Sequence, residues 1–576
     1  MADSGDVTTG KVRLQYMVRD LAAAGTGSDL LEGWEYMASE AILDGPVCRK
    51  VAIVDIDPDT SLVKPGTRFV SPKKGAKLGR YLIRDPQNPG AADFQQASVF
   101  GAIMKTIDLF EEPDVLGRSI RWAFDGGQLL VVPRAGRMAN AFYHRDSRSL
   151  QFFFFDASVN GKDTTIYTCL SPDIVAHETT HAILDGIAPD LYDATSPQAL
   201  ALHEAIADLS AAIFAIRTKR LALEVLRLTG GDIGQATAFN EIALQFGTAL
   251  AGSERPLRDL NNTYSFSNWG KPPVSNDPHD LCNVLTGALY GLLVEEHKKA
   301  KLEIVKKKKH VQGDTAASAI PDTEAAALFS ASGKALATAG NIFKRIVFRG
   351  LDYLPPGEIS FADYGRALIA ADTSSNPDDH QARDYIIQEF VRRGIVSAAN
   401  EMITPTADFV LPPDLDLDLL VRSDWSAYQF AETYRGKLMI PPNVPFEVRP
   451  RLDVVKTTYR SGSGKAQIRE CLFKIAWREN QRIEYPGGRF SKISVIYGTT
   501  LVIDRDSMSI RALLSTSPRH ASQQAPATAA NNAMRMAFLS ECFEKGLLEI
   551  GSPNVQIQDD TLRLRAMGQM LHMAGH

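Results

Sequence analysis

The stretch HETTH at residues 177–181 limits most strongly how this chain can fold. Its histidines, His177 and His181, are four positions apart (181 − 177 = 4), so on a helix both imidazoles lie on one face, one turn apart. Apolar residues flank the motif at 174–176 and 182–184. This pattern predicts a buried helix, and buried histidines need hydrogen-bond partners or a metal. The alternative is a helix whose two histidines face solvent.

A zinc site is the chemistry that this spacing favours. Two imidazoles one turn apart can bind a single Zn²⁺, and the glutamate between them projects beside the metal, where it can act as a base. His177 and His181 are therefore predicted metal ligands, and Glu178 is the predicted general base. Because the short motif also arises by chance in unrelated chains, the prediction depends on finding a third ligand.

A second stretch, HEAIAD at residues 203–208, supplies that ligand. Glu204 and Asp208 are again four positions apart (208 − 204 = 4), in a helix otherwise rich in alanine and leucine. Carboxylates on a buried helix face are costly unless a metal or hydrogen-bond donors compensate them. Glu204 is the predicted third ligand, and Asp208 is predicted to accept the free N–H of a liganding histidine. A surface stripe of acids is the alternative, and the apolar neighbours argue against it.

With these residues in place, the sequence resembles the thermolysin-like zinc metallopeptidases, the gluzincins. HETTHAILDGIAPDLY at residues 177–192 matches their HExxH pattern, in which a tyrosine, here Tyr192, follows eleven residues after the second histidine (192 − 181 = 11). EAIAD at residues 204–208 matches the family's glutamate helix. The likeness covers roughly residues 97–395.

The resemblance implies further site residues. Asn140 and Ala141 resemble the family's edge strand, which would hold the substrate backbone in an extended form. Arg255 resembles an arginine that contacts the substrate carbonyl beyond the scissile bond. His279 resembles the family's catalytic histidine, and together with Tyr192 it would hydrogen-bond the oxyanion. For Tyr192 and His279 the alternative is ordinary packing or helix capping.

The sequence also departs from the family pattern at two places. The residue before the zinc glutamate is usually asparagine, whereas here it is His203, so the support of one metal ligand is expected to differ. Asp173 stands where a calcium ligand is found, but Ala215 occupies a position that needs an acid. Calcium prefers six to eight oxygen ligands, so zinc is the expected cofactor and calcium is not expected.

The predicted fold class is α+β, with a thermolysin-like catalytic domain made of a β-rich N-lobe and a helical C-lobe. We predict an N-terminal extension at 1–95, the metallopeptidase domain at 96–400, a proline- and aspartate-rich linker at 401–418 and a C-terminal β-rich domain at 419–576. Three helices are predicted to start at Ser171–Pro172, Ser196–Pro197 and Asp277–Pro278, where an N-cap residue precedes proline.

Composition narrows the partners and the location. The 576-residue chain has a formal charge of −5, which disfavours a nucleic-acid partner. No uninterrupted apolar run approaches the ~18 residues that cross a bilayer, so no membrane span is expected. Five cysteines without a CxxC pair indicate reduced thiols. The N-terminus shows no export signal, so a cytoplasmic location is expected, with non-classical export as the alternative.

The predicted function is zinc-dependent cleavage of peptide bonds inside a protein or peptide substrate, with Glu178 as the base. One alternative is a zinc-stabilised interaction scaffold that cleaves nothing, and another is an aminopeptidase, for which no clamp for a free amine is evident. The partners of the C-terminal domain stay unassigned. His572 and His576, in a methionine-rich tail, are interpreted as a frayed helix end.

Overall fold

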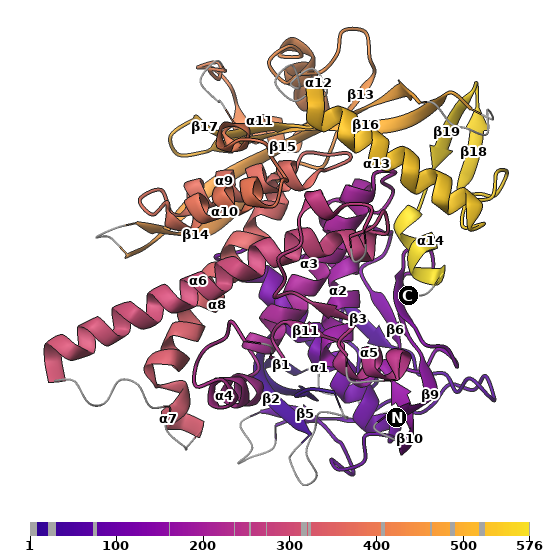
Figure 1. Cartoon of the computed structure of the whole chain (residues 1–576), viewed down its shortest axis with the longest axis vertical. Coiled ribbons are helices and arrows are strands. Elements are labelled where there is room, and N and C mark those ends of the chain that lie inside the picture. Colours follow the sequence, from indigo (N-terminus) through magenta and orange to yellow (C-terminus); the bar gives the residue numbers. More distant parts are fainter. Residues whose placement is uncertain are drawn as a thin grey trace, which may run out of the picture.

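The computed structural model shows a chain of mixed α and β structure, with most strands toward the two ends of the sequence and most helices between them (Figure 1). This arrangement confirms the predicted α+β class and the β-rich C-terminal part. The structure describes residues 8–20, 30–72, 78–159, 162–235, 237–252, 255–271, 274–312, 320, 324–404, 409–460, 464–483, 490–517 and 525–574.

The strands of the N-terminal part form two four-stranded sheets and a hairpin among the described residues before position 170. One sheet has the order β2-β1-β5-β4 and the other β3-β6-β8-β7, so that β7 is an edge strand. The strands are β1 (Thr8–Met17), β2 (Leu31–Ile42), β3 (Val51–Ile53), β4 (Phe69–Val70), β5 (Gly79–Tyr81), β6 (Leu129–Val132), β7 (Ala141–His144), β8 (Ser149–Phe152), β9 (Phe154–Val159) and β10 (Lys162–Tyr167).

Helix α1 (Ala92–Glu111) joins the N-terminal strands to the rest of the molecule. It packs so closely on β1 that a Cβ added at Gly101 would lie 2.0 Å from the carbonyl oxygen of Gln15. Only glycine allows this approach. Val12 and Leu14 of β1 belong to the same buried core as Phe100 of α1. The described part of the predicted extension at 1–95 therefore shares its core with the region that follows.

Helices dominate the middle of the chain. Their starts at Pro172, Pro197 and Pro278 confirm the three predicted boundaries. The α-helices are α2 (Pro172–Ile187), α3 (Pro197–Ile216), α4 (Lys219–Leu228), α5 (Leu244–Ala251), α6 (Pro278–Gln312), α7 (Glu324–Leu328), α8 (Ala331–Arg349), α9 (Phe361–Ser375) and α10 (Gln381–Arg392). Short elements between them are β11 (Glu241–Ile242), β12 (Arg258–Asp259) and the 3₁₀ helices η2 (Thr168–Leu170), η3 (Pro189–Leu191), η4 (Phe266–Asn268), η5 (Gly350–Tyr353) and η6 (Ala399–Met402).

Helix α3 lies at the centre of this core, and every one of its residues is buried. By length and composition α3 could also cross a membrane, which is a property that core helices of soluble proteins share. No other helix among the described residues passes that test. Its complete burial inside the fold accounts for its apolar composition.

The C-terminal part is a seven-stranded curled sheet within the described residues. Its strands follow the order β13-β15-β16-β19-β18, and β14 and β17 pair with β15 and β16. The elements are α11 (Leu417–Arg422), α12 (Asp424–Thr433), β13 (Phe446–Val448), β14 (Leu452–Arg460), β15 (Gly464–Arg482), β16 (Lys492–Asp504), β17 (Ser509–Ser515), α13 (Ala525–Glu544), β18 (Val555–Gln558), β19 (Thr561–Leu564) and α14 (Met567–Ala574).

This sheet packs against the helices through apolar and charged contacts. Val454, Leu472 and Val502 belong to the same core cluster as α1 and α3. The buried carboxylate of Asp352, in η5, accepts hydrogen bonds from Arg118 at 2.6 Å and from Lys456 of β14 at 2.7 Å. In the predicted linker at 401–418, Phe409 and Leu411 are also buried, in a second core formed with α12 and β15. All five cysteines are free and buried.

Candidate metal centre

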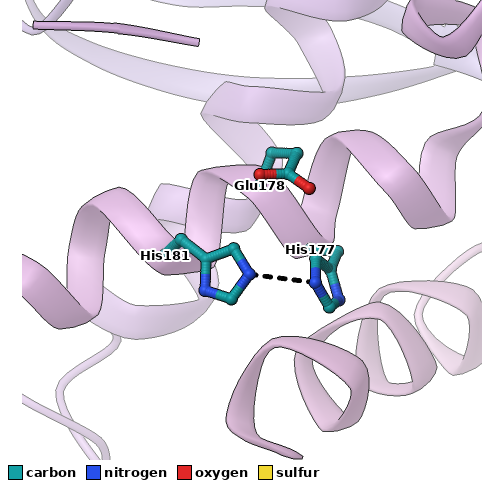
Figure 2. A group of neighbouring side chains, drawn as sticks. All are labelled: His177, Glu178 and His181. Carbon is teal, nitrogen blue, oxygen red and sulfur yellow. Dashed lines mark hydrogen bonds between the residues drawn. The ribbon is translucent and has the colours of Figure 1, made fainter. Parts of the chain in front are cut away.

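Helix α2 presents both histidines of the HETTH motif on one buried face (Figure 2). The Nε2 atoms of His177 and His181 lie 2.9 Å apart, as the spacing of four residues predicts. Glu178 lies between them in sequence and is also buried. The apolar neighbours of the motif pack into the core, which accounts for the burial of the helix. The alternative of two solvent-facing histidines is therefore wrong.

Glu204 of α3 faces these two imidazoles. Its Oε2 lies 3.4 Å from Nε2 of His177, and its Oε1 lies 3.5 Å from Nε2 of His181. Oε2 of Glu204 is buried and accepts no hydrogen bond from the described residues. Ligands of a tetrahedral Zn²⁺ at its usual bond lengths lie ~3.3 Å from one another. Two imidazoles and one carboxylate at these separations could hold such an ion.

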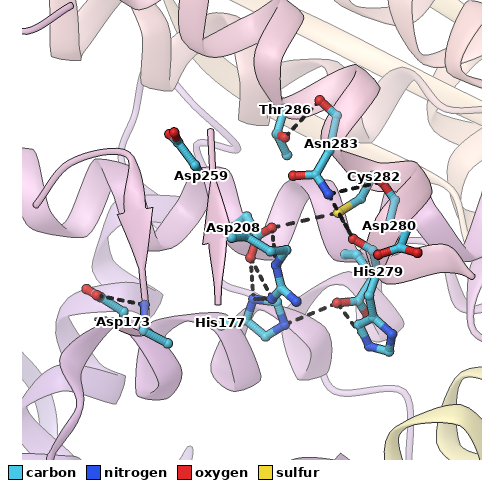
Figure 3. Close-up of polar contacts among 12 residues, drawn as sticks. Asp173, His177, Asp208, Asp259, His279, Asp280, Cys282, Asn283 and Thr286 are labelled. Carbon is cyan, nitrogen blue, oxygen red and sulfur yellow. Dashed lines mark hydrogen bonds and ion pairs between the residues drawn. The ribbon is translucent and has the colours of Figure 1, made fainter. Parts of the chain in front are cut away.

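Asp208 supports His177 from the other side of its ring (Figure 3). Nδ1 of His177 donates to Asp208 Oδ1 at 3.0 Å, so Nε2 is the ring nitrogen that faces Glu204. Burial lowers the pKa of His177, but the neighbouring carboxylates of Asp208 and Glu204 outweigh it and raise the pKa to about 9. Arg258 donates to both oxygens of Asp208, at 2.7 and 2.9 Å. Burial raises the pKa of Asp208, but Arg258 and His177 outweigh this effect and hold the pKa below its usual value.

His203 supports the second histidine, at the position where the family has asparagine. Its Nδ1 lies 2.6 Å from Nδ1 of His181, and the two rings stack. Burial lowers the pKa of His203 to about 3, so the ring stays neutral and can accept a hydrogen bond. His181 then donates through Nδ1 and keeps its Nε2 lone pair toward Glu204. Histidine in place of asparagine at position 203 thus replaces one hydrogen-bond acceptor for His181 by another.

Glu178 is held beside the cluster by the edge strand. Its Oε2 accepts a hydrogen bond from the backbone N–H of Tyr143, in β7, at 3.0 Å. Burial raises the pKa of its carboxyl group above the usual value. A carboxyl group of this kind is poised to take up a proton.

Tyr192 and His279 lie at the same cluster. Both line a small cavity together with Glu204 and His203. Nε2 of His279 lies 3.6 Å from Glu204 Oε2, and its Nδ1 is 2.9 Å from Asp277 Oδ1. Burial lowers the pKa of His279, but Glu204 and Asp277 outweigh it and raise the pKa above the usual value. The hydroxyl of Tyr192 donates to the carbonyl oxygen of Tyr143 at 3.2 Å.

Asn140 and Ala141 lie at the start of the edge strand, next to the cluster. Ala141 lines a cavity shared with His177 and Glu178, whose other walls are Ile174, Ile242, Ala243, Phe246, Leu257 and Arg258. Asn140 is buried, and its Nδ2 donates to the backbone carbonyl of His572 at 2.9 Å. The substrate-binding residues expected in β7 are thus brought to the cluster.

Arg255 does not lie at the cluster, which corrects the expectation that it contacts the substrate carbonyl. Its side chain is exposed, whereas Arg258, three residues on, is buried against Asp208 (258 − 255 = 3). The reason is local: Arg258 belongs to the short strand β12, where successive side chains alternate between core and solvent. Arg258 points inward and Asp259 outward, and Arg255 precedes the strand.

His572 was missed by the sequence interpretation. Its prediction as a frayed end is wrong, because the side chain is 7% exposed and its Nε2 lies 2.7 Å from Glu204 Oε1. Glu204 and His572 are 368 positions apart, and no sequence motif links positions so distant. The hydrophobic pattern of α14 indicates a helix with one buried face, but not which part of the molecule covers that face. His576 lies outside the described residues.

Two groups of described histidines and carboxylates lie close enough together to hold a metal. One is His177, Glu178 and His181, and the other is His181, Glu204 and His572. Asp173, the position of a calcium ligand in the resemblance, belongs to neither group. Burial and the neighbouring Asp20 raise the pKa of its carboxyl group.

Comparison with known proteins adds no assignment. No protein-family model matches this chain. None of the curated proteins matches it in sequence. Any assignment of function therefore depends on the geometry of the cluster and on the motifs that form it.

Proposed function

We propose that this chain is a zinc-dependent endopeptidase with a thermolysin-like catalytic region. The observation that supports this most directly is the convergence of His177, His181 and Glu204 beside a buried Glu178. The two-lobed arrangement expected for this family agrees with strands that precede α2 and helices that follow it.

The predicted ligands define what the metal would do and which residues would orient its two histidines. When bound, Zn²⁺ would polarise the scissile carbonyl and lower the pKa of an attacking water. His177, His181 and Glu204 would hold it, because a three-ligand N/N/O set is typical of catalytic zinc. Asp208 and His203 fix the tautomers of the two histidines.

The remaining residues act on substrate and protons. Glu178 would take a proton from the attacking water and pass it to the leaving amine, and its raised pKa suits both transfers. The Tyr143 N–H keeps its carboxylate in place. His279 and Tyr192 would donate hydrogen bonds to the oxyanion. Asn140 and Ala141 would hold the substrate backbone along β7.

The cavity beside Glu178 indicates what the substrate presents there. Its walls include Ile174, Ile242, Phe246 and Leu257, so an apolar side chain fits best. Arg258, at the same cavity, is already paired with Asp208 and would orient a substrate carbonyl only through a remaining N–H. The substrate class is thus an extended protein or peptide segment with an apolar residue next to the scissile bond.

One observation favours the second candidate, a zinc-stabilised scaffold. Nε2 of His572 lies 2.7 Å from Glu204 Oε1, close enough to act as a further ligand, and a site closed by four protein ligands is typical of structural zinc. Against the scaffold stands Glu178, because a structural site needs no buried carboxyl group with a raised pKa beside its ligands.

Metal removal tests the proposal. The purified chain should contain about one zinc per molecule, measured by elemental mass spectrometry. Treatment with a chelator should abolish cleavage of an unfolded protein at high substrate concentration, and added Zn²⁺ should restore it. Cleavage that persists in the metal-free chain would refute the proposal, and zinc that stabilises the chain without any cleavage would favour the scaffold.

Replacement of Asp208 by asparagine tests the support of the metal. Asparagine keeps the size but removes the charge that accepts from His177 and pairs with Arg258. Zinc affinity should fall roughly 10–100-fold, as is usual when a partner of a liganding histidine is lost. Competition with a chromophoric chelator measures it. The matched control is Asp163→Asn, at an exposed aspartate of β10, which should leave the affinity unchanged. Equal affinities for the two variants would contradict the assigned role.

A further inference from the structure

The C-terminal helix α14 lies against the candidate metal centre (Figure 1). Together with Tyr192, His203, Glu204 and His279, three of its residues wall the small cavity at the cluster: Gly568, Leu571 and His572. The imidazole of His572 packs edge-on against His181, with ring centroids 4.5 Å apart. A segment distant in the sequence thus completes the wall of the site.

His572 offers a further donor atom next to Glu204 and His181. Its Nε2 lies 2.7 Å from Glu204 Oε1, and donor atoms of His181, Glu204 and His572 all lie within 4.8 Å of one another. A catalytic zinc site has three protein ligands and keeps its fourth position for water or substrate. An imidazole at this place would fill that position.

The backbone of α14 also occupies the side chain of Asn140, a residue expected to bind substrate. Asn140 donates through Nδ2 to the carbonyl oxygen of His572 at 2.9 Å. The carbonyl oxygen of Tyr192 accepts a hydrogen bond from the N–H of Gly568 at 3.0 Å. A bound peptide would present the same kinds of backbone donor and acceptor. The helix and an extended substrate therefore compete for the Nδ2 group of Asn140, and the Tyr192 carbonyl is a further anchor of the helix beside it.

Side-chain packing fixes the position of the helix. A Cβ added at Gly568 would lie 2.8 Å from Cδ2 of Tyr192, so glycine lets the helix contact this ring directly. Asp193 accepts a hydrogen bond from the N–H of Ala566 at 2.8 Å, and Gln569 contacts His144 at 2.9 Å between its Nε2 and the imidazole Nε2. These contacts place His572 at Glu204.

The connection to the sheet is short. Only Arg565 and Ala566 separate β19 from α14. A tethered segment meets its site at a high effective concentration, of the order of millimolar for a short linker. Contacts that would be weak between separate molecules are then sufficient to keep the cleft closed, and no covalent change is needed to open it.

We propose that His572 is a fourth protein ligand of the metal and that α14 is an internal inhibitor that closes the substrate cleft. This inference rests on the proposed peptidase function. Release of α14 exposes the metal, Asn140 and Tyr192 to substrate. Because the helix competes with substrate, the closed state raises the apparent KM and leaves kcat unchanged at saturating substrate.

X-ray absorption of the zinc-loaded full chain tests the ligand directly, since it counts imidazoles around the metal. Three imidazoles are expected in the unchanged chain and two in the His572→Ala variant. Gly568→Leu is a second variant, which keeps His572 but forces the helix off Tyr192, and it should also show two. Met573→Ala, at an exposed position of the same helix, is the matched control and should keep three.

Peptide cleavage by the same four proteins tests the closure. The apparent KM should fall at least about tenfold in His572→Ala and Gly568→Leu and should stay unchanged in the Met573→Ala control. Two imidazoles in all four proteins with equal KM values would overturn the inference and leave the peptidase proposal intact. A drop from three imidazoles to two without cleavage in any protein would support the fourth ligand and reject the peptidase.

Discussion

Replacement of Glu178 by glutamine is expected to lower kcat for peptide hydrolysis by at least about 100-fold, because general acid–base groups contribute roughly 10²–10⁴ to such rates. The amide of glutamine has nearly the same shape, and its Oε1 can still accept the hydrogen bond from the Tyr143 N–H. It cannot take a proton from water. Zinc content should therefore stay at about one per chain while turnover is lost.

Glu178→Gln is best made in the chain that also carries His572→Ala, because the lower apparent KM expected for that variant makes saturation easier to reach. Zinc content by mass spectrometry and cleavage of an unfolded protein at saturating substrate are then compared with His572→Ala alone. Glu401→Gln is the matched control for a glutamate-to-glutamine change, because this carboxylate also accepts hydrogen bonds from backbone N–H groups, those of residues 397 and 398. It should leave zinc content and turnover unchanged. Equal turnover with and without Glu178 would show that another group is the base.

Replacement of Asp352 by asparagine is expected to lower the free energy of unfolding by roughly 3–5 kcal/mol, the usual cost of breaking a buried ion pair from one side. Arg118 and Lys456 both donate to its carboxylate, and Asp352 and Lys456 have fully buried side chains. Burial opposes the charge of Asp352, but these two cations outweigh it and hold its pKa below the usual value. Asparagine removes this anion from both cations and leaves Glu470, whose Oε2 lies 3.9 Å from Lys456 Nζ, as a more distant partner of the lysine.

Denaturant unfolding measures the effect of Asp352→Asn, with Asp156→Asn as the control. Asp156 pairs with Arg137 at 3.1 Å, but both side chains are exposed, so its loss should cost no more than about 1 kcal/mol. Replacing both members of the buried pair, as Asp352→Leu with Lys456→Met, should cost less than the sum of the single changes. Additive effects, or a cost like that of the control, would contradict the role of this ion pair.

Local sequence patterns predicted those site residues that lie one turn apart on the same helix. The pairs His177–His181 and Glu204–Asp208 are each four residues apart on helices whose apolar neighbours bury them, so both pairs face the core. The starts of α2, α3 and α6 followed from proline at the first helical position.

Predictions failed where a contact depends on pairing between distant segments. Arg258 rather than Arg255 reaches Asp208 because pairing of β11 with β12 decides which side chains point inward. His572 reaches Glu204 only after the C-terminal sheet has packed on the helices, and no spacing in the sequence encodes that contact. The pairing of His203 with His181 is an intermediate case. The sequence showed that histidine replaces the usual asparagine at position 203, but it did not show that this histidine contacts His181.

The shared core of the C-terminal sheet and the helices has a practical consequence for dissecting this protein. Val454, Leu472 and Val502 belong to the same apolar core cluster as residues of α1 and α3. Cutting the polypeptide near position 400 would expose these surfaces on both fragments to water, where they promote aggregation. The C-terminal sheet and the helices therefore share one apolar core, and activity measurements on a fragment cut near position 400 would report on a molecule that has lost part of that core.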